Sequence, residues 1–330
     1  MTAEFELIRK YFSRPARSAI LGVGDDAALL QPSEGQCLAV SSDTLIAGVH
    51  FTPETDPAQL GWKALAVNLS DLAAMGAKPR WVLLALTLPN TDNEWLMQFS
   101  SGMYQCADQY DIDLVGGDTT RGSLGMTLTI MGEVPMQQAL RRSGAQVGDI
   151  IWVSGELGDA ALALAGQRQD ISVADNVLQT LLLRLNVPEP RVELGLALRN
   201  LAHSAIDLSD GLLADIGHLL AASGVAATIE TTHIPVSAAA SHLSEEANFW
   251  SYVLAGGDDY ELCFTAPESA TQAIMALSNQ LRLPLTAIGR IEAGTGLRVL
   301  DGSGQPILLK KAGYDHFQSD AGNIADNMAE

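Results

Sequence analysis

The sequence predicts a two-domain protein of the α/β (α+β) class. Helical and strand patterns alternate along the chain, which is typical of layered folds that pack helices against sheets. At 330 residues, the chain is longer than one compact core usually holds. The segment 141–148 becomes polar and contains glycines. We therefore expect domains at 1–143 and 144–330.

The first domain is expected to follow the order α, β, α, β, α, β, β. A helix over 57–75 has the clearest signals, because Pro57 suits a first helical turn, and Gly76 followed by Pro79 ends the apolar run. The continuous apolar run 81–88 predicts a strand buried on both faces. The other predicted elements are helices over 4–12 and 93–110 and strands over 37–40, 112–115 and 126–134.

The second domain begins again with a strand and mixes both patterns. Apolar periodicity separates its helices from its strands. The predicted helices cover 159–166, 176–185, 191–202 and 212–222, and the predicted strands cover 149–154, 226–230, 261–265, 287–291 and 297–300.

The chain is strongly acidic, with 39 Asp and Glu against 19 Lys and Arg and a formal charge of −20. This balance argues against a nucleic-acid surface, which needs clustered positive charge. It would also repel an anionic substrate, unless bound divalent cations inverted the local field.

The cysteines and the N-terminal residues indicate the cellular compartment expected for this protein. Cys37, Cys106 and Cys263 are far apart and form no Cys-x-x-Cys pair, which favours free thiols in a reducing compartment. The first residues lack an apolar signal core, and no apolar run approaches the length of a membrane span. We therefore expect a soluble, cytoplasmic protein with no membrane partner.

The aspartates are the most informative residues, because they gather beside glycines and serines in short clusters. Aspartate supplies the hard oxygen ligands that Mg²⁺ prefers, and glycine permits sharp turns and close approach of a ligand to the backbone. Several such loops converging on one site would hold divalent cations together with phosphate. The clusters are 22–26, 41–43, 68–71, 116–118, 207–211 and 256–259.

Several clusters also have a plainer interpretation. Asp71 lies late in an apolar helix, where a lone Asp usually belongs to a solvated outer face. The 22–26 segment could be a glycine-rich turn with solvated acids, and 116–122 could be a hairpin turn rather than an anion-binding nest. Ser209 or Asp210 could cap the following helix, which would explain one acid of that motif but not both. A lone histidine such as His50 is more often structural than a ligand. The chain has no Walker A motif.

Taken together, the ordered motifs resemble the thiamine-monophosphate kinase family. This family belongs to the ATP-binding superfamily that includes aminoimidazole ribonucleotide synthetase and selenophosphate synthetase. Each motif is weak alone, but the ordered set is specific and spans nearly the whole chain. The segments that carry the resemblance are 21–28, 42–45, 68–77, 116–122, 207–212, 256–262 and 313–317.

The resemblance implies a fold, a reaction and a set of site residues. It implies ATP-dependent phosphorylation of thiamine monophosphate to thiamine diphosphate with several Mg²⁺ ions, by a homodimer whose N-terminal sheets join into a barrel-like core. Asp26, Ser41, Ser42, Asp43, Asp71, Asp118, Asp207 and Asp210 match the metal-binding pattern. Asp43, Asp71, Asp118 and Asp210 are expected to be catalytic. Gly117, Asp118, Arg142 and Ser209 match the ATP site, and His50, Asp258 and Tyr314 match the thiamine-phosphate site.

One position departs from the family pattern. The family usually has Glu where this chain has Asp258, so the carboxylate is one methylene shorter. Asp258 could meet the cationic thiazolium or the aminopyrimidine, and Tyr314 could stack on a ring.

General chemistry agrees with a kinase that transfers phosphate directly from ATP to its acceptor. Phosphoryl transfer depends on positioning and charge neutralisation more than on a covalent group. The alternatives are a selenophosphate synthetase, which uses a reactive cysteine near the N-terminus, and a hydrogenase-maturation relative, which uses a C-terminal cysteine. Cys37 and Cys263, the first and last cysteines, disfavour both, and the Asp-x-Asp-x-Asp-Gly spacing of a calcium-binding module is absent.

Overall fold

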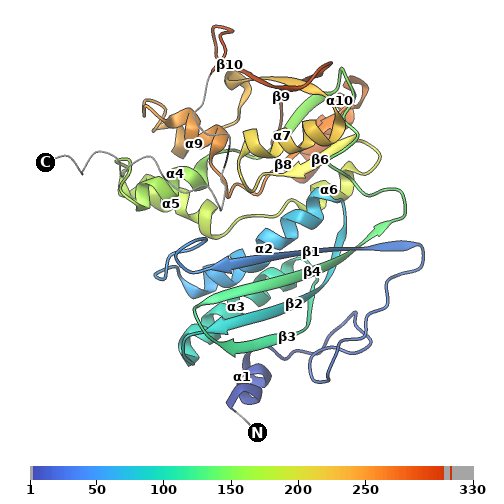
Figure 1. Ribbon diagram of the computed structural model, residues 1–330, viewed down its shortest axis with the longest axis vertical. Helices are drawn as coiled ribbons and strands as arrows, with labels where there is room; N and C mark the ends of the chain where they lie inside the picture. Colours follow the sequence, from blue (N-terminus) through green and yellow to red (C-terminus); the bar gives the residue numbers. More distant parts are fainter. Residues whose placement is uncertain (1–2, 308–312, 314–330) are drawn as a thin grey trace, which may run out of the picture.

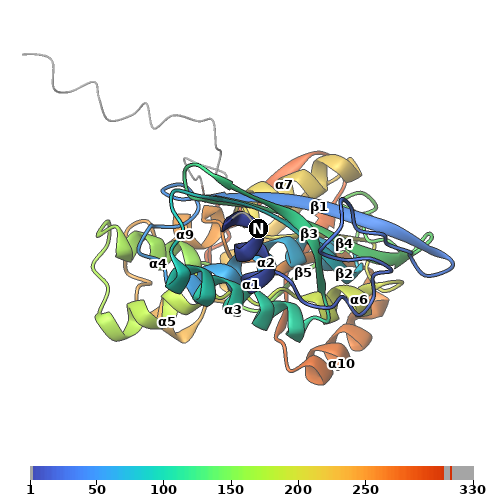
Figure 2. The ribbon, with the colours of Figure 1, turned by 90° about the horizontal axis from the view of Figure 1, so that it is seen from below.

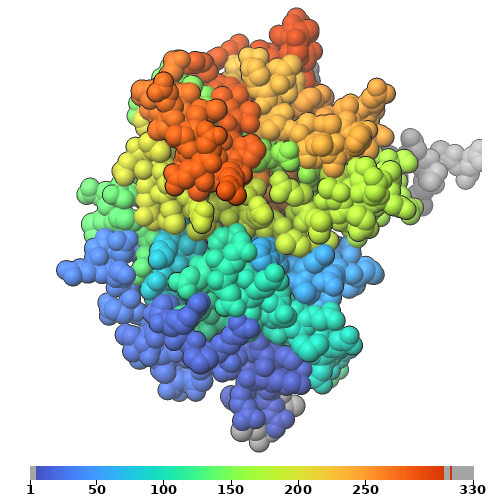
Figure 3. Space-filling view, turned by 180° about the vertical axis from the view of Figure 1, so that it is seen from behind, coloured from blue at the N-terminus to red at the C-terminus, as the bar shows by residue number. Residues whose placement is uncertain are grey.

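The structure is a computed structural model that describes residues 3–307 and Gly313. It contains two sheets, one in each half of the chain (Figure 1). Viewed from behind, the two halves are stacked directly on one another (Figure 3). Helix α1 lies beyond the first sheet, at the end of the molecule farthest from the second half (Figure 1 and Figure 2).

The first half follows the predicted element order. Its four-stranded sheet has the order β1-β4-β2-β3, with β2 and β3 parallel and the other pairs antiparallel. Its elements are α1 (Ala3–Tyr11), β1 (Gln36–Ile46), α2 (Pro57–Ala74), β2 (Lys78–Leu88), α3 (Asn93–Gln109), β3 (Asp113–Arg121) and β4 (Gly125–Pro135).

The second half contains a six-stranded sheet with the order β10-β7-β9-β5-β8-β6. Its strands are β5 (Ile150–Ser154), β6 (Ser204–Asp207), β7 (Ala226–Glu230), β8 (Leu262–Ala266), β9 (Leu285–Glu292) and β10 (Gly296–Leu300). Its helices are α4 (Asp159–Gln167), α5 (Asp175–Asn186), α6 (Val192–Leu198), α7 (Leu212–Ser223), α8 (Ala238–Ser241), α9 (Phe249–Ala255) and α10 (Thr271–Leu281), with 3₁₀ turns η1 (Thr231–His233) and η2 (Glu268–Ala270).

Three expectations about the elements are wrong. Strand β3 continues through Gly116, Gly117 and Asp118, because their backbone pairs with β2, so this segment is neither a hairpin turn nor a nest. Strand β2 is not buried on both faces, because α2 and α3 cover only one side and Ala85 on the other side is exposed. The predicted helix over 191–202 ends at Leu198, and the unpredicted strand β6 follows it.

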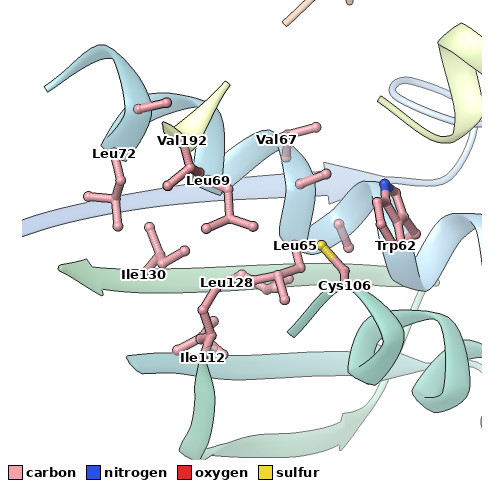
Figure 4. Packing of buried hydrophobic residues seen from close by; sticks show 14 of the residues in the cluster. Trp62, Leu65, Val67, Leu69, Leu72, Cys106, Ile112, Leu128, Ile130 and Val192 are labelled. Carbon is pink, nitrogen blue, oxygen red and sulfur yellow. The ribbon is translucent and has the colours of Figure 1, made fainter. Parts of the chain in front are cut away.

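Helix α2 is the central element of the molecule. Asp56 caps its N-terminus by accepting a hydrogen bond from the Gln59 N–H at 2.9 Å, and Pro57 occupies the first turn. Figure 4 shows Leu65, Leu69 and Leu72 of this helix above the β4 strand, toward Leu128 and Ile130. The helix also contacts β6, β8 and α6, so it lies between the two sheets.

Two glycines let α2 and α3 approach closely. A Cβ atom at Gly61 would lie 2.0 Å from the carbonyl oxygen of Phe99, and one at Gly102 would lie 1.8 Å from that of Ala58. Both distances are far inside van der Waals contact, so the crossing requires glycine at each position.

The second sheet is covered on both faces. Trp152 and Phe264 face the core that includes α2, whereas Ile151 and Cys263 face a second core with α4, α7 and α9. Because the first core contains residues from both halves, the halves form a continuous interior. The domain division at 143/144 stays a prediction.

The outer face of the first sheet exposes apolar side chains along β1. Val40 is 56% exposed, and Leu38 and Ile46 are each 44% exposed. The segment before β1 covers only another part of this face, where Ala16 and Leu30 pack against Trp81. No helix in the described part of the chain is long and apolar enough to cross a membrane.

Candidate active site

Three aspartates from different elements meet where α2 passes between the sheets. Asp43 lies on β1, Asp71 lies near the end of α2, and Asp207 ends β6 in the second half. Ser41 donates a hydrogen bond to Asp71 at 2.5 Å, and Ser70 donates one to Asp207 at 2.8 Å. Residues distant in sequence thus form one carboxylate cluster, Asp43, Asp71 and Asp207, which we call the acid cluster.

The acid cluster is electrostatically strained. Burial raises the pKa of Asp207 to about 8, and the Asp71 charge adds to this effect. Burial and the neighbouring Asp71 raise the pKa of Asp43 to about 6. Burial also raises the pKa of Asp71, although Ser41 and the Arg142 charge oppose the change. The surroundings therefore disfavour three ionised carboxylates together, and in the absence of a cation the cluster retains protons.

The acid cluster fits Mg²⁺ as one side of a shared site. No three His, Cys, Asp or Glu side chains in the described ranges lie close enough to hold a metal ion by themselves. Mg²⁺ is usually bound by one or two carboxylates, with waters and substrate phosphates completing the octahedron. Carboxylates contributed by three separate elements, without a complete protein cage, match that pattern.

The 207–211 and 256–260 segments pack directly against each other. The Asp258 N–H donates to the Ser209 carbonyl at 2.9 Å, and the Tyr260 N–H donates to the Leu208 carbonyl at 2.8 Å. A Cβ atom at Gly257 would lie 2.3 Å from the Ser209 carbonyl oxygen. The glycine therefore permits this contact, which brings Asp258 beside the Ser209 and Asp210 motif.

Neither Ser209 nor Asp210 caps α7, so that simpler explanation of the motif is wrong. The helix begins after Gly211 without a side-chain cap. Instead, the Asp215 carboxylate accepts hydrogen bonds from the N–H groups of Asp210 and Gly211 at 3.0 and 3.1 Å. The Asp210 carboxylate is thus not used in capping.

Asp258 is held by two side chains. The Lys63 Nζ atom lies 3.2 Å from Asp258 Oδ1, and the Tyr260 hydroxyl donates to the same oxygen at 2.9 Å. Asp258 has φ 70° and Tyr260 has φ 50°, both in the left-handed region that non-glycine residues seldom adopt. Strained backbone of this kind is concentrated at functional sites.

The end of this loop is anchored by a buried ion pair. Glu261 accepts hydrogen bonds from Arg191 Nε at 2.7 Å and from the Ser154 hydroxyl at 2.5 Å. The segment before Arg191 also contacts the first half, where the Trp62 indole donates to the Pro188 carbonyl at 2.8 Å. Glu261 therefore fixes the loop to the second half directly, and to the first half through the segment 188–191.

The structure does not bring every predicted site residue together. Asp118 lies on β3 at the opposite sheet edge from β1, three strand spacings or roughly 14 Å away. The register places it in line with Ala85, Thr127 and Thr44, on the outer face that also carries Ser42.

The remaining predicted residues lie on several different segments. Gly117 precedes Asp118 in β3, and a Cβ atom there would meet the Leu84 carbonyl oxygen at 1.8 Å. Asp26 is exposed in the segment before β1, and His50 follows β1 and accepts a hydrogen bond from the Ile46 N–H at 3.0 Å. Arg142 is exposed. Tyr314 lies outside the described residues.

Several residues of the site were not predicted from the sequence. Asn68 accepts a hydrogen bond from the Asp43 N–H at 3.1 Å, and Ser70 orients Asp207. Both residues precede Asp71 in a helix whose sequence is otherwise largely apolar, so their polar side chains are a sequence signal for the site. Lys63 could be singled out in the same way, because it is the one Lys or Arg residue in α2. A separate hollow of about 760 Å³ between α1 and α3 is lined by none of the predicted site residues.

Comparisons with known proteins match both halves of the chain. Residues 24–134 match the AIR synthase related protein, N-terminal domain, and residues 146–302 match the C-terminal domain of the same description. The fold and the acid cluster thus define a two-domain protein of the AIR synthase related class.

Individual relatives narrow the class. Thiamine-monophosphate kinase of Escherichia coli K12 is 49% identical over 95% of this chain and 98% of its own length. The crystal structure of thiamine-monophosphate kinase from Stenotrophomonas maltophilia K279a has a TM-score of 0.83 at 49% identity and covers 92% of this chain and 96% of its own. AaThiL complexed with AMPPCP and TMP has a TM-score of 0.77 at 30% identity, over 95% and 96% of the two chains. The chain belongs to the thiamine-monophosphate kinase family.

Proposed function

We propose that this chain transfers the terminal phosphoryl group of ATP to thiamine monophosphate, forming thiamine diphosphate and ADP. The acid cluster of Asp43, Asp71 and Asp207 carries the proposal, because both halves contribute carboxylates whose ionised forms the protein does not compensate and a divalent cation would. The relatives' names and the relative bound to AMPPCP and TMP support the same reaction. They disfavour the selenophosphate synthetase and hydrogenase-maturation alternatives.

The site residues divide into two groups. Asp43, Asp71 and Asp207 would hold Mg²⁺, which when bound neutralises the charge between the two phosphate-bearing substrates. Asp210 would contribute a further carboxylate, because Asp215 rather than Asp210 occupies the neighbouring N–H groups. Asp258 would contact the ring end of thiamine monophosphate.

Transfer is proposed to occur directly between the two substrates. The acceptor is a phosphate oxygen that is already anionic, so the reaction needs no strong general base. Holding the two phosphates in line supplies much of the rate enhancement by proximity. The carboxylates are needed as ionised metal ligands, which makes them poor nucleophiles.

We also propose a homodimer formed through the outer face of the first sheet. Apolar side chains such as Val40 and Leu38 remain exposed there, and a second copy would cover them. Asp118 and Ser42 lie on the same face, so pairing of two sheets would bring these predicted ligands into an enclosed region. We further propose a cytoplasmic location, where ATP is available and the buried thiols of Cys106 and Cys263 stay reduced.

The test follows ADP and thiamine diphosphate formation from ATP with Mg²⁺. The expected result is equal amounts of both products, strictly dependent on thiamine monophosphate. ATP made chiral at its terminal phosphate should give inverted product, because a single in-line transfer inverts the phosphorus. Retention of configuration would refute direct transfer, and absence of thiamine diphosphate would refute the activity.

A further inference from the structure

A buried lysine links the central helix to the loop that carries the proposed substrate contact. Lys63 is 2% exposed, and its Nζ atom lies 3.2 Å from Asp258 Oδ1. Burying an ammonium group is energetically costly unless the group is well paired. Among the described residues, Asp258 forms an ion pair with Lys63, and this contact offsets the cost of burying the ammonium group.

The two contacts to Asp258 converge on one oxygen. Lys63 and the Tyr260 hydroxyl both meet Oδ1, while the Asp258 side chain keeps 31% of its surface exposed. The second oxygen, Oδ2, is therefore the one left for a ligand. Because an ammonium already balances the carboxylate charge, Asp258 is better suited to accept a hydrogen bond than to act as the counter-ion of a cationic ring.

Helix α2 fixes the distance between this contact and the acid cluster. Ser70 lies seven residues after Lys63, which is two helical turns, so both side chains share the face toward the second half. Their separation along the helix is roughly 10 Å. One rigid helix thus sets the spacing between Asp258 and the carboxylates proposed to meet the phosphates.

We propose that Lys63 is a positioning residue that holds the Asp258 carboxylate to accept a hydrogen bond from the aminopyrimidine of thiamine monophosphate. The inference rests on the proposed kinase function and deepens it. Lys63 does not touch the substrate and acts through Asp258. Together with Tyr260, it compensates for the strained backbone that presents Asp258, and it ties the ring-binding loop to the helix that carries Asp71.

The first test is steady-state kinetics of Lys63→Met, which keeps the aliphatic stem and removes the charge. We expect KM for thiamine monophosphate to rise about tenfold, while KM for ATP and kcat stay within about twofold, because only binding of one substrate is affected. Lys78→Met removes the same charge from an exposed position at the start of β2, and it should leave all three constants unchanged.

A double-mutant cycle tests whether Lys63 acts through Asp258. In an Asp258→Asn background, adding Lys63→Met should change KM for thiamine monophosphate by less than about twofold, because coupled residues are not additive. A full tenfold effect in that background would overturn the proposal. A merely structural role would lower kcat and raise both KM values to a similar extent, and that result would also overturn the proposal.

Tyr260→Phe is the second variant and is decisive if Lys63→Met does not fold. It removes only the hydroxyl that donates to Oδ1. Calorimetric binding of thiamine monophosphate in the presence of AMPPCP and Mg²⁺ should weaken several-fold, and unchanged binding would refute the arrangement. If the wild type phosphorylates thiamine monophosphate, and both variants bind and phosphorylate it as well as the wild type does, this inference alone is overturned. A wild-type chain that does not phosphorylate thiamine monophosphate would overturn the proposed function as well.

Discussion

Replacing Asp207 with Asn should make the metal-free protein more stable at alkaline pH. Asp207 is 4% exposed, and burial together with the Asp71 charge raises its pKa to about 8. The folded chain then binds a proton that the unfolded chain, with an ordinary value of 3.8, has already lost. Stability therefore falls as pH rises from about 4 to about 8, because the folded state binds more protons in that interval.

The magnitude follows from the pKa change. At about 1.4 kcal/mol per pKa unit, the change from 3.8 to about 8 sets an upper bound of about 6 kcal/mol on the free energy of unfolding that the wild type loses at pH 8 through Asp207. At pH 5 the corresponding bound is about 2 kcal/mol. Relaxation and water penetration around the buried charge reduce both bounds, so we expect a gain of about 2 kcal/mol at pH 8 and less than about 1 kcal/mol at pH 5.

The assay is urea unfolding in EDTA at both pH values, followed by circular dichroism. Ser70 can still donate its hydrogen bond to the amide oxygen of the asparagine that replaces Asp207, so the variant should remain folded. Asp170→Asn removes a charge from an exposed position and serves as the control. With Mg²⁺ and AMPPCP added, the wild type should gain more stability than Asp207→Asn, which should also lose activity. A variant less stable than wild type at pH 8, or equally stabilised at both pH values, would refute the reasoning.

Three further outcomes are expected. Asp43→Asn should stay folded but lose about 100-fold in activity at limiting Mg²⁺, equivalent to about 2.7 kcal/mol of transition-state stabilisation; full activity in a kinase assay would contradict this role. Gly102→Ala should destabilise the α2–α3 crossing by about 2–3 kcal/mol in thermal unfolding, whereas Gly217→Ala, which meets nothing within 4 Å, should stabilise α7 by up to about 1 kcal/mol. Equal effects of the two glycine substitutions would contradict the packing argument. Light scattering should give about twice the 34.9 kDa chain mass, Val40→Arg should shift it toward one chain mass, and a monomeric wild type would contradict the dimer.

Local sequence determined much of the fold. Apolar periodicity and end signals placed α2, α3 and α7 within a few residues, because such signals act along neighbouring turns. Helices α9 and α10 were not predicted. In α10 only Ile274 and Leu277 are buried, so its apolar face is narrow and its pattern is weak. The length of β3 was also missed, because pairing with β2 rather than local propensity extends it across Gly116 and Gly117.

The sequence by itself also determined which residues are proposed to carry the chemistry, because the short Gly, Ser and Asp clusters have few uses other than turns and metal-phosphate sites. Only the tertiary structure decided which of them meet. Strand alternation places Asp43 on the inner face of the first sheet, toward Asp71 of α2, whereas it places Asp118 on the outer face. The packing of α2 between the sheets then brings Asp207 to the same place as Asp43 and Asp71. Lys63 became significant only when the second half buried it against Asp258, because a charge on a helix has no fixed meaning until its neighbours and its distance from solvent are known.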